Sequence, residues 1–232
     1  MRTRVALSFL LFAGLCAAPA FAQRVGTRIG RNLNEKNGAS ALAIVVECYA
    51  NARTKQARMW MEALPGSPAE KTLLDRENPQ FSLCMASNAM VMDNKRIRMS
   101  SRTVRRPLGI EMARLMLVNG RPVPPLTAEP VFTFASRLAG AKSDEFNADD
   151  VSYLEFGHCV AVHAWTASLD LLRSSVGSAE EHAAQNKMIP ALGPCLTEGM
   201  KVTIQRENLR EIVGEPVYHL LTGPAAGAGG DA

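Results

Sequence analysis

Four cysteines are the residues of this chain whose spacing most clearly predicts chemistry. Cys48 and Cys84 are as far apart in the sequence as Cys159 and Cys195. An even set of cysteines outside the cytoplasm is typical of a disulfide framework, and four of them allow three pairings. If each half was once a free-standing unit, it had to close its own bridge, which favours Cys48 with Cys84 and Cys159 with Cys195. There is no C-x-x-C and no paired Cys/His spacing, so we expect structural disulfides and no bound metal ion.

Glu155 and His158 have the E-x-x-H spacing that places a carboxylate and an imidazole one helical turn apart. A di-iron site of this kind needs a second E-x-x-H and two more carboxylates. No second motif exists, so His158 is predicted to be a buried, hydrogen-bonded residue. The chain also lacks G-x-S-x-G, H-E-x-x-H and a glycine-rich phosphate loop. We therefore predict no catalytic residue, no metal site and no cofactor.

A run of basic residues is the remaining candidate for a binding site. Twelve residues without an acid contain Lys95, Arg96, Arg98, Arg102, Arg105 and Arg106. The last four share one face if the helix there begins early. Such a cationic strip can bind the phosphate or carboxylate groups of a lipid head group, an outer-membrane sugar or an acidic protein. The alternative is an ordinary solvated face, partly balanced by the acidic residues between positions 144 and 150.

The elements that position these residues occur twice. Adding 111 to a residue number carries Cys48, Gly66, Ser67, Pro79 and Cys84 onto Cys159, Gly177, Ser178, Pro190 and Cys195. Identity at cysteines and turn residues, where geometry is most demanding, predicts a tandem duplication. The predicted fold is mainly α: two disulfide-stapled three-helix units with short β segments, related by a pseudo-twofold axis.

Within each unit, apolar periodicity and turn residues predict the helices. A stripe over residues 39–63 predicts one helix of about six turns. Ser67 and Glu70, and likewise Ser178 and Glu181, form capping boxes that begin the second helices, which prolines at 79 and 190 should break or end. Third helices are expected at 101–118 and 208–221, after short β segments at 90–99 and 201–205. The helix at 148–176 is apolar on nearly every side and is expected at the centre of the molecule.

The start of the chain predicts export. Arg2 and Arg4 precede an apolar run, and Ala20-Phe21-Ala22 supplies small residues before a cut, so residues 1–22 read as a signal peptide. Lipidation of Cys16 is the alternative, but Leu15 is a poor residue before a lipidated cysteine. No later stretch is long enough to be a transmembrane segment. Removing the signal lowers the net charge from +4 to +2, which gives no reason to expect a nucleic-acid partner.

A cysteine in a first helix, a Gly-Ser turn with a capping box, a cysteine followed by Leu or Met, and a last helix with Arg210, Glu215 and Tyr218 form a further pattern. It resembles uncharacterised secreted alphaproteobacterial proteins, over most of residues 40–118 and 150–222. Pro216 departs from the pattern. The resemblance implies a periplasmic or secreted helical module and carries no known activity.

Together these features predict a domain order: signal peptide 1–22, flexible basic arm 23–38, repeat 39–120, linker 121–147, repeat 148–222 and disordered tail 223–232. The function expected is a secreted or periplasmic binding or interaction module of unknown ligand that is not an enzyme, with an anionic surface or an acidic protein as a candidate partner. The alternatives are a hydrolase or transferase with a site between the repeats, and a holdase-type chaperone, suggested by methionine-rich apolar surface.

Overall fold

The protein is mainly helical. The computed structural model describes residues 38–88, 99–118, 123, 126, 130–200 and 202–223. Nine α-helices and two short 3-10 turns, at Gly193–Cys195 and Arg206–Asn208, lie in this part of the chain, which contains no β-strand. The helices are α1 (Gly38–Ala52), α2 (Thr54–Glu62), α3 (Pro68–Ser87), α5 (Ser101–Val118), α6 (Ala135–Leu138), α7 (Ala148–His163), α8 (Trp165–Arg173), α9 (Ala179–Leu192) and α10 (Leu209–Thr222). None of them is both long enough and apolar enough to cross a bilayer.

Each predicted long first helix is divided into two, so that prediction is wrong in both units. The backbone leaves the helical region at Arg53 (φ −132°, ψ 43°) and at Ala164 (φ −122°, ψ 40°). After the first break the buried face shifts by one residue: Trp60 and Met61 are fully buried, whereas Met59 is 40% exposed. The break therefore lets α1 and α2 each place its own apolar side on the core.

Both capping boxes begin their helices as predicted. The Ser67 hydroxyl accepts a hydrogen bond from the amide of Glu70 (3.2 Å), and Ser178 accepts one from Glu181 (3.1 Å). The glycine before each serine has a positive φ, 75° and 78°, a conformation that glycine adopts without steric cost. The two turns thus have one geometry, at positions 111 residues apart.

The prediction that a proline ends each second helix is wrong in the first unit, where α3 continues past Pro79 to Ser87. In the second unit α9 ends at Leu192, two residues after Pro190 and three before Cys195, close to the predicted place. A proline removes the donor for the carbonyl four residues earlier. Those carbonyls belong to Asp75 and Asn186, which are exposed, as both prolines are, so water can bond them.

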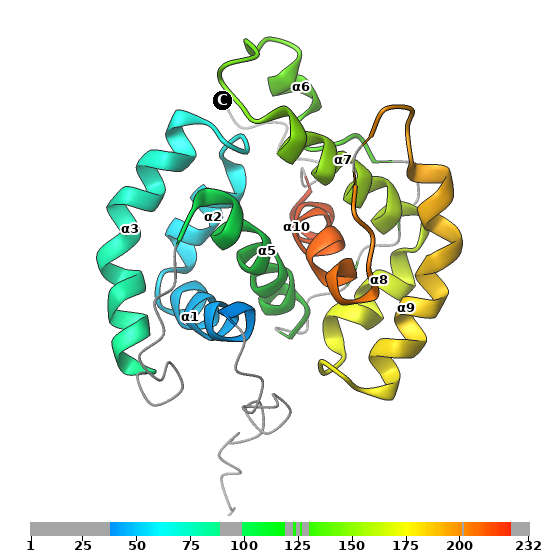
Figure 1. Ribbon diagram of the computed structural model, residues 1–232, viewed down its shortest axis with the longest axis horizontal. Helices are drawn as coiled ribbons and strands as arrows, with labels where there is room; N and C mark the ends of the chain where they lie inside the picture. The colour runs from blue at the N-terminus through cyan, green and yellow to red at the C-terminus, as the bar shows by residue number, and fades with distance from the viewer. Residues whose placement is uncertain are drawn as a thin grey trace, which may run out of the picture. The chain divides into compact units, whose positions relative to one another are not determined.

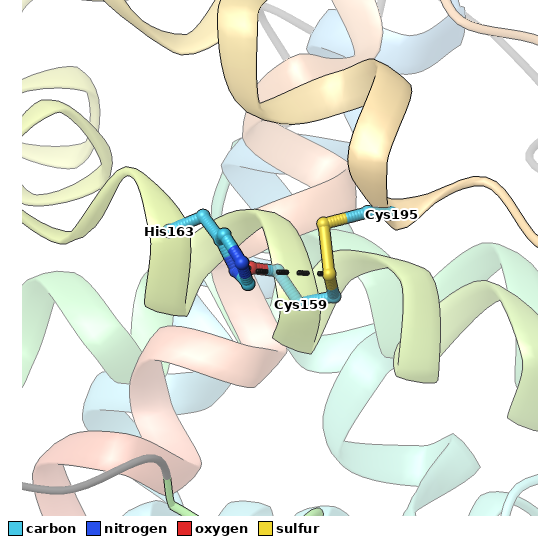
Figure 2. Close-up of side chains that lie close together, drawn as sticks. All are labelled: Cys159, His163 and Cys195. Carbon is cyan, nitrogen blue, oxygen red and sulfur yellow. Dashed lines mark hydrogen bonds between the residues drawn. A yellow bond between two sulfur atoms is a disulfide. The ribbon is translucent and has the colours of Figure 1, made fainter.

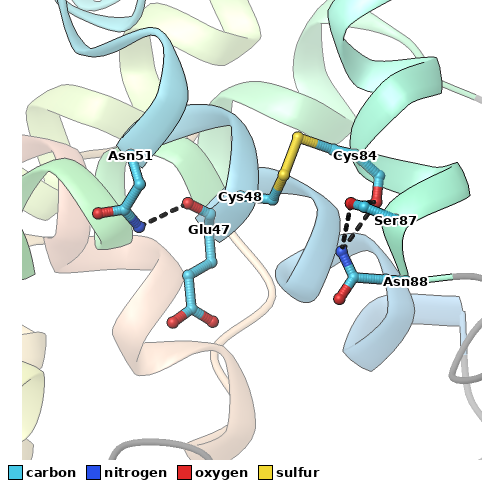
Figure 3. Close-up of a disulfide and its surroundings, with 6 residues drawn as sticks. All are labelled: Glu47, Cys48, Asn51, Cys84, Ser87 and Asn88. Atoms are coloured by element: carbon cyan, nitrogen blue, oxygen red, sulfur yellow. Dashed lines mark hydrogen bonds between the residues drawn. A yellow bond between two sulfur atoms is a disulfide. The ribbon is translucent and has the colours of Figure 1, made fainter. Parts of the chain in front are cut away.

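Two disulfides close the units in the predicted pairing. Cys159 joins Cys195, tying α7 to the turn after α9 (Figure 2). Cys48 joins Cys84, tying α1 to α3 (Figure 3). Both bridges have a Cα–Cα distance of 5.7 Å and a sequence separation of 36. Each therefore clamps the first helix of its unit to the end of the second long helix.

Helices α5 and α10 lie side by side between the two disulfide-closed groups, with α1 packing on α5 and α7 on α10 (Figure 1). A Cβ on Gly109 would lie 2.6 Å from Cβ of Glu215, and one on Gly214 would lie 2.9 Å from the amide nitrogen of Ile110. Glycines thus let the two backbones approach closely. Helix α10 is buried at every position from 212 to 219, so it is α10, and not 148–176, that occupies the centre. Helix α7 keeps an exposed side at Glu155.

The predicted β segments are not seen where the structure can test them. Most of 90–99 lies outside the described residues, as does Lys201. Residues 202–205 form no strand. Their polar groups bond the following turn instead: the Asn208 side chain donates to the carbonyl of Thr203 (2.7 Å) and accepts from the amide of Gln205 (2.9 Å). The third helices, in contrast, match the predicted ranges to within one residue.

Candidate functional site

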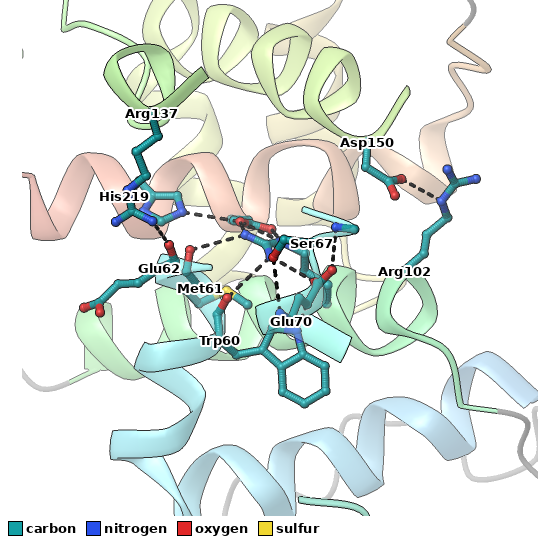
Figure 4. Close-up of polar contacts among 12 residues, drawn as sticks. Trp60, Met61, Glu62, Ser67, Glu70, Arg102, Arg137, Asp150 and His219 are labelled. Atoms are coloured by element: carbon teal, nitrogen blue, oxygen red, sulfur yellow. Dashed lines mark hydrogen bonds and ion pairs between the residues drawn. The ribbon is translucent and has the colours of Figure 1, made fainter. Parts of the chain in front are cut away.

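Arg105, one member of the predicted cationic strip, is buried at the centre of the protein and does not face solvent. Its guanidinium donates to Glu70 on α3 (2.9 Å) and to both carboxylate oxygens of Glu215 on α10, at 2.5 to 3.0 Å. His219 lies one turn further along α10, with Nε2 3.3 Å from Glu215. We call these four residues the central ion cluster (Figure 4).

Secondary structure supplies the rest of the hydrogen bonds in the cluster. Nη1 and Nη2 of Arg105 face the carbonyl oxygens of Trp60 and Met61, the last turn of α2, at 3.4 and 3.3 Å. The Glu70 carboxylate accepts from the Trp60 indole (3.1 Å) and from the amide of Gly66 (2.6 Å). The glutamate that caps α3 is therefore also the partner of the buried arginine, which explains why a capping residue is 1% exposed.

The charges of the cluster stabilise one another. Burial by itself would raise the pKa of Glu215, but the charge of Arg105 and hydrogen bonds from His219 and Arg105 outweigh it and hold that pKa below its usual range. Burial opposes the charge of Arg105 too, yet Glu215 and Glu70 raise its pKa above the ordinary value. Both groups thus stay ionised in the interior, as buried charges do only when paired and hydrogen-bonded.

The segment between the units closes over the cluster. Phe134 is fully buried, with its ring 5.2 Å from the ring of His219 and 5.7 Å from the guanidinium carbon of Arg105. Arg137 on α6 lies over the same ring at 5.7 Å and donates to the carbonyl of Glu62 (Figure 4). The predicted linker is therefore part of the packed structure here.

The second unit contains a smaller version of the same arrangement. Nε of Arg210 on α10 donates to Glu181 (2.6 Å), and its Nη2 donates to the carbonyl of Ser174 (3.0 Å). Glu181 accepts from the amide of Gly177 (2.5 Å), as Glu70 does from Gly66. Burial lowers the pKa of Arg210, and the hydrogen bond and charge of Glu181 offset this only in part. Each capping glutamate thus pairs with an arginine from the last helix of its unit.

Three arginines of the predicted anion-binding strip lie in the described part of the chain, and each has a partner there. Arg98 lies outside the described residues. Arg102 is half exposed and pairs with Asp150 at 2.6 Å. Arg106 lies 4.0 Å above the Tyr153 ring and 3.8 Å from Glu211. Arg105 is 4% exposed. Arg105 is therefore not part of a surface strip, whereas anion binding by Arg98, Arg102 and Arg106 stays a prediction.

The pocket beside the central ion cluster is small. It has a volume of about 20 Å³, which is room for about one water molecule, and its lining includes Glu70, Arg105 and Glu215 of the cluster itself. Through its ion pairs the cluster links α3, α5 and α10.

His158 occupies the environment predicted for it. The residue is 9% exposed, and Nε2 lies 2.9 Å from the carbonyl oxygen of Pro130. Glu155, its E-x-x-H partner, is exposed, so the two side chains do not converge on one site. The ring of His158 makes an edge contact with Phe132 at 5.7 Å.

An open groove lies between this histidine and the segment before α6. Its volume is about 360 Å³, and it is lined by Pro130, Val131, Phe132, His158, Cys159 and Val162. Val131 is 81% exposed, the highest value among the large apolar residues exposed in the described part. Polar and apolar atoms contribute almost equally to the lining surface. The side chains of Val131, Phe132 and Val162 offer contact to aliphatic or aromatic groups.

The edge of the groove contains a cluster that the sequence analysis missed. Nδ1 of His163 lies 3.8 Å from Sγ of Cys159 and 3.1 Å from the carbonyl oxygen of the same residue. Cys195 completes the group through the disulfide (Figure 2). The signal was present as Cys-x-x-x-His, the i, i+4 spacing that places two side chains on one face of a helix.

Comparison with known proteins gives no family: no family model, no curated protein and no solved structure matches this chain.

Proposed function

We propose that this protein is a secreted or periplasmic interaction module, without catalytic activity, that binds an apolar segment of another protein in the groove beside Val131. The observation that carries the proposal is an open groove with Val131, Phe132 and Val162 in its lining, in which Val131 is 81% exposed. Single exposed apolar residues are common on protein surfaces, but one that lines a groove supplies both contact area and shape.

The openness of the groove favours a protein segment over a small molecule. Small-molecule sites bury most of their ligand and place a few convergent polar groups around it. Here one wall is largely open to solvent, and the His158 ring nitrogen Nε2 faces the Pro130 carbonyl at 2.9 Å. When a segment of another protein binds, the rest of that protein can shield the outward face of the segment from water.

The pairing of the buried charges supports a role without catalysis. Arg105 and Arg210 are each held by carboxylates of this chain, and buried Glu77 lies 3.2 Å from both Arg53 and Arg76. A catalytic acid or base has to reach the proton that it transfers on the substrate. The central ion cluster, which lies between the units, is likewise fully paired within this chain.

Two disulfides support an extracellular or periplasmic location. Bridges of this kind persist in oxidising compartments and are rare in the cytosol. Together with the predicted signal peptide at 1–22, they are consistent with an exported protein. The resemblance to uncharacterised secreted alphaproteobacterial proteins would give the same location, and it stays a prediction.

We also propose that the two units arose by tandem duplication and are related by a pseudo-twofold axis. Adding 111 to the bounds of α2 and to the first residue of α3 gives those of α8 and α9, and the two backbone breaks correspond in the same way. The contact between α5 and α10 is reciprocal: Gly109 packs on Glu215, and Gly214 packs on Ile110. Gly109 and Gly214 are 105 residues apart in the sequence. The same spacing separates Ile110 from Glu215 and Arg105 from Arg210.

The groove can be tested with a library of displayed peptides selected on the oxidised protein. We expect enriched peptides with two or more apolar side chains, whose binding is lost in Val131→Asp. Because Val131 is exposed, this change should alter the free energy of unfolding by less than about 0.5 kcal/mol. The matched control is Val176→Asp, a valine that is 61% exposed and does not line the groove.

Three outcomes would contradict the proposal. Enriched peptides that bind Val131→Asp and wild type equally would place the binding surface elsewhere. Equal loss in Val131→Asp and Val176→Asp would indicate diffuse apolar binding, as expected of a holdase. Failure to enrich any apolar peptide would remove the groove as a binding site.

A further inference from the structure

The two disulfides differ in one chemically important neighbour. Beside the second bridge, ligand atoms of Cys159, His163 and Cys195 all lie within 4.8 Å of one another, and no other group of three His, Cys, Asp or Glu this close occurs among the described residues. Figure 2 shows the imidazole beside the sulfur of Cys159. Two sulfurs and one imidazole nitrogen form the ligand set that binds zinc in many proteins.

The first bridge lacks this third ligand. The position that corresponds to His163 is Ala52, the last residue of α1, four residues after Cys48. Two side-chain amides near this bridge are bonded to the backbone: Asn51 donates to the carbonyl of Glu47 (2.7 Å), and Asn88 donates to that of Cys84 (2.8 Å) (Figure 3). The first unit therefore supplies a control site, with a corresponding pair of cysteines, Cys48 and Cys84, and no histidine.

We propose that the thiol form of the second unit binds one zinc ion through Cys159, Cys195 and His163. The cysteines of an exported chain are free thiols until an oxidant forms the disulfide. A dithiol can reduce the bridge to two thiols again, and the dithiol is itself oxidised to a disulfide. In this form the two thiols release their protons and each sulfur donates an electron pair to Zn²⁺. Nδ1 of the imidazole becomes the third donor, and its proton moves to solvent or to Nε2. Oxidation and metal binding are thus alternative ways to close the unit.

The geometry agrees with such a site. Zn–S bonds of about 2.3 Å and a Zn–N bond of about 2.0 Å, in a tetrahedron, place sulfur and nitrogen about 3.5 Å apart and the two sulfurs about 3.8 Å apart. Nδ1 of His163 already lies 3.8 Å from the Cys159 sulfur. Without the sulfur–sulfur bond, side-chain rotation can separate the two sulfurs. The imidazole gives up one hydrogen bond to the carbonyl of Cys159.

Exposure suggests how the fourth position is filled. His163 is exposed and Cys159 is half-buried, whereas Cys195 is 4% exposed. The ion would therefore be anchored on the protein side by Cys195 and be open to solvent beside the imidazole. Three protein ligands with a water in the fourth position are typical of accessible zinc sites, in contrast to closed structural sites with four protein ligands.

The test is a Zn²⁺ titration of the full chain against a chromophoric chelator, with the protein reduced by a phosphine, and a parallel Co²⁺ titration that reports sulfur ligands by absorption. We expect one ion per reduced chain and none per oxidised chain. His163→Ala should weaken Zn²⁺ binding at least tenfold, and Cys159→Ser with Cys195→Ser should abolish it. Cys48→Ser with Cys84→Ser, the matched control, should leave it unchanged.

A variant that creates a second zinc site in the first unit tests the proposal without any change to the second unit. Ala52→His places an imidazole four residues after Cys48, and we expect the reduced variant to bind two ions instead of one. If reduction lowers helicity by circular dichroism, Zn²⁺ should restore it in wild type and not in His163→Ala. The proposal is overturned by a reduced chain that binds no Zn²⁺, or by His163→Ala that binds as tightly as wild type.

Discussion

Replacing Arg105 by Met should be among the most destabilising single changes on the surface of α5 that faces α10. Among the described residues, the change removes the only cation that contacts both Glu70 and Glu215, and these carboxylates are 1% and 2% exposed. Removing one partner of a buried ion pair costs about 3 to 5 kcal/mol, because a charge remains without compensation. This is a large part of the roughly 5 to 15 kcal/mol that stabilises a typical domain.

The matched control lies three residues earlier on the same helix. Arg102 also forms an ion pair, with Asp150 at 2.6 Å, but its side chain is 47% exposed. Water screens such a pair, so Arg102→Met should cost no more than about 1 kcal/mol. The two arginines form ion pairs of similar length but differ in burial. The two substitutions should therefore lower the free energy of unfolding by amounts that differ several-fold.

Urea unfolding followed by tryptophan fluorescence measures the difference. The indole of Trp60 is fully buried and donates to Glu70, so its emission reports on the cluster directly. With a urea slope of about 1 to 3 kcal/mol per molar, Arg105→Met should lower the midpoint by on the order of 1 to 5 M. Adding Glu215→Gln should recover part of the loss, because one uncompensated carboxylate is removed.

Equal costs for Arg105→Met and Arg102→Met would refute the reasoning. That result would mean that Arg105 is solvated, as the predicted cationic strip required. A double variant with Glu215→Gln that is less stable than the sum of the single variants would also contradict the charge argument.

Three further predictions follow from particular contacts. The pKa of Glu215 is lowered in the folded state, so its contribution to stability is present above about pH 4.5 and lost as the pH falls through the folded pKa; Glu215→Gln should flatten that part of a stability curve measured by urea midpoints. Gly109→Ala should destabilise by about 1 to 3 kcal/mol, because its Cβ would meet the backbone of α10, whereas Gly193→Ala, with nothing within 4 Å, should be neutral or slightly stabilising in thermal melts. Replacing Cys48 and Cys84 by alanine should cost about 2 to 5 kcal/mol, and chelation should leave the melting of the oxidised protein unchanged.

Local signals predicted the parts of the fold whose causes are local. The caps at Ser67 and Ser178 need only a hydroxyl and an amide three residues away. The cysteine pairs follow from their repeated spacing. The breaks at Arg53 and Ala164 could not be predicted, because neither site has a glycine or proline and each break depends on which side chains the core accepts.

The candidate sites depend on contacts between residues far apart in the sequence, so the sequence predicted them less well than the fold. Arg105 is one of six basic residues in a run, and its burial follows from Glu215, 110 residues further along the chain. His163 was visible at one turn from Cys159, but without a C-x-x-C this spacing gave no reason to expect metal chemistry. The groove beside Val131 joins a segment before α6 to α7, and no sequence pattern marks such a surface.

The disulfides also divide the protein mechanically. Each closes a loop of 36 residues. When an oxidised chain is pulled at its ends, the disulfide bears the force in place of the loop. The roughly 120 Å of contour length in each loop therefore cannot be extended. Helices α2, α8 and α9, and α3 as far as Cys84, lie within the two loops and carry no load, whereas α5 and α10 lie outside them. The seam between these two helices, with no covalent tie among the described residues, is therefore where an oxidised molecule should yield first, leaving two intact lobes joined by a stretched bridge.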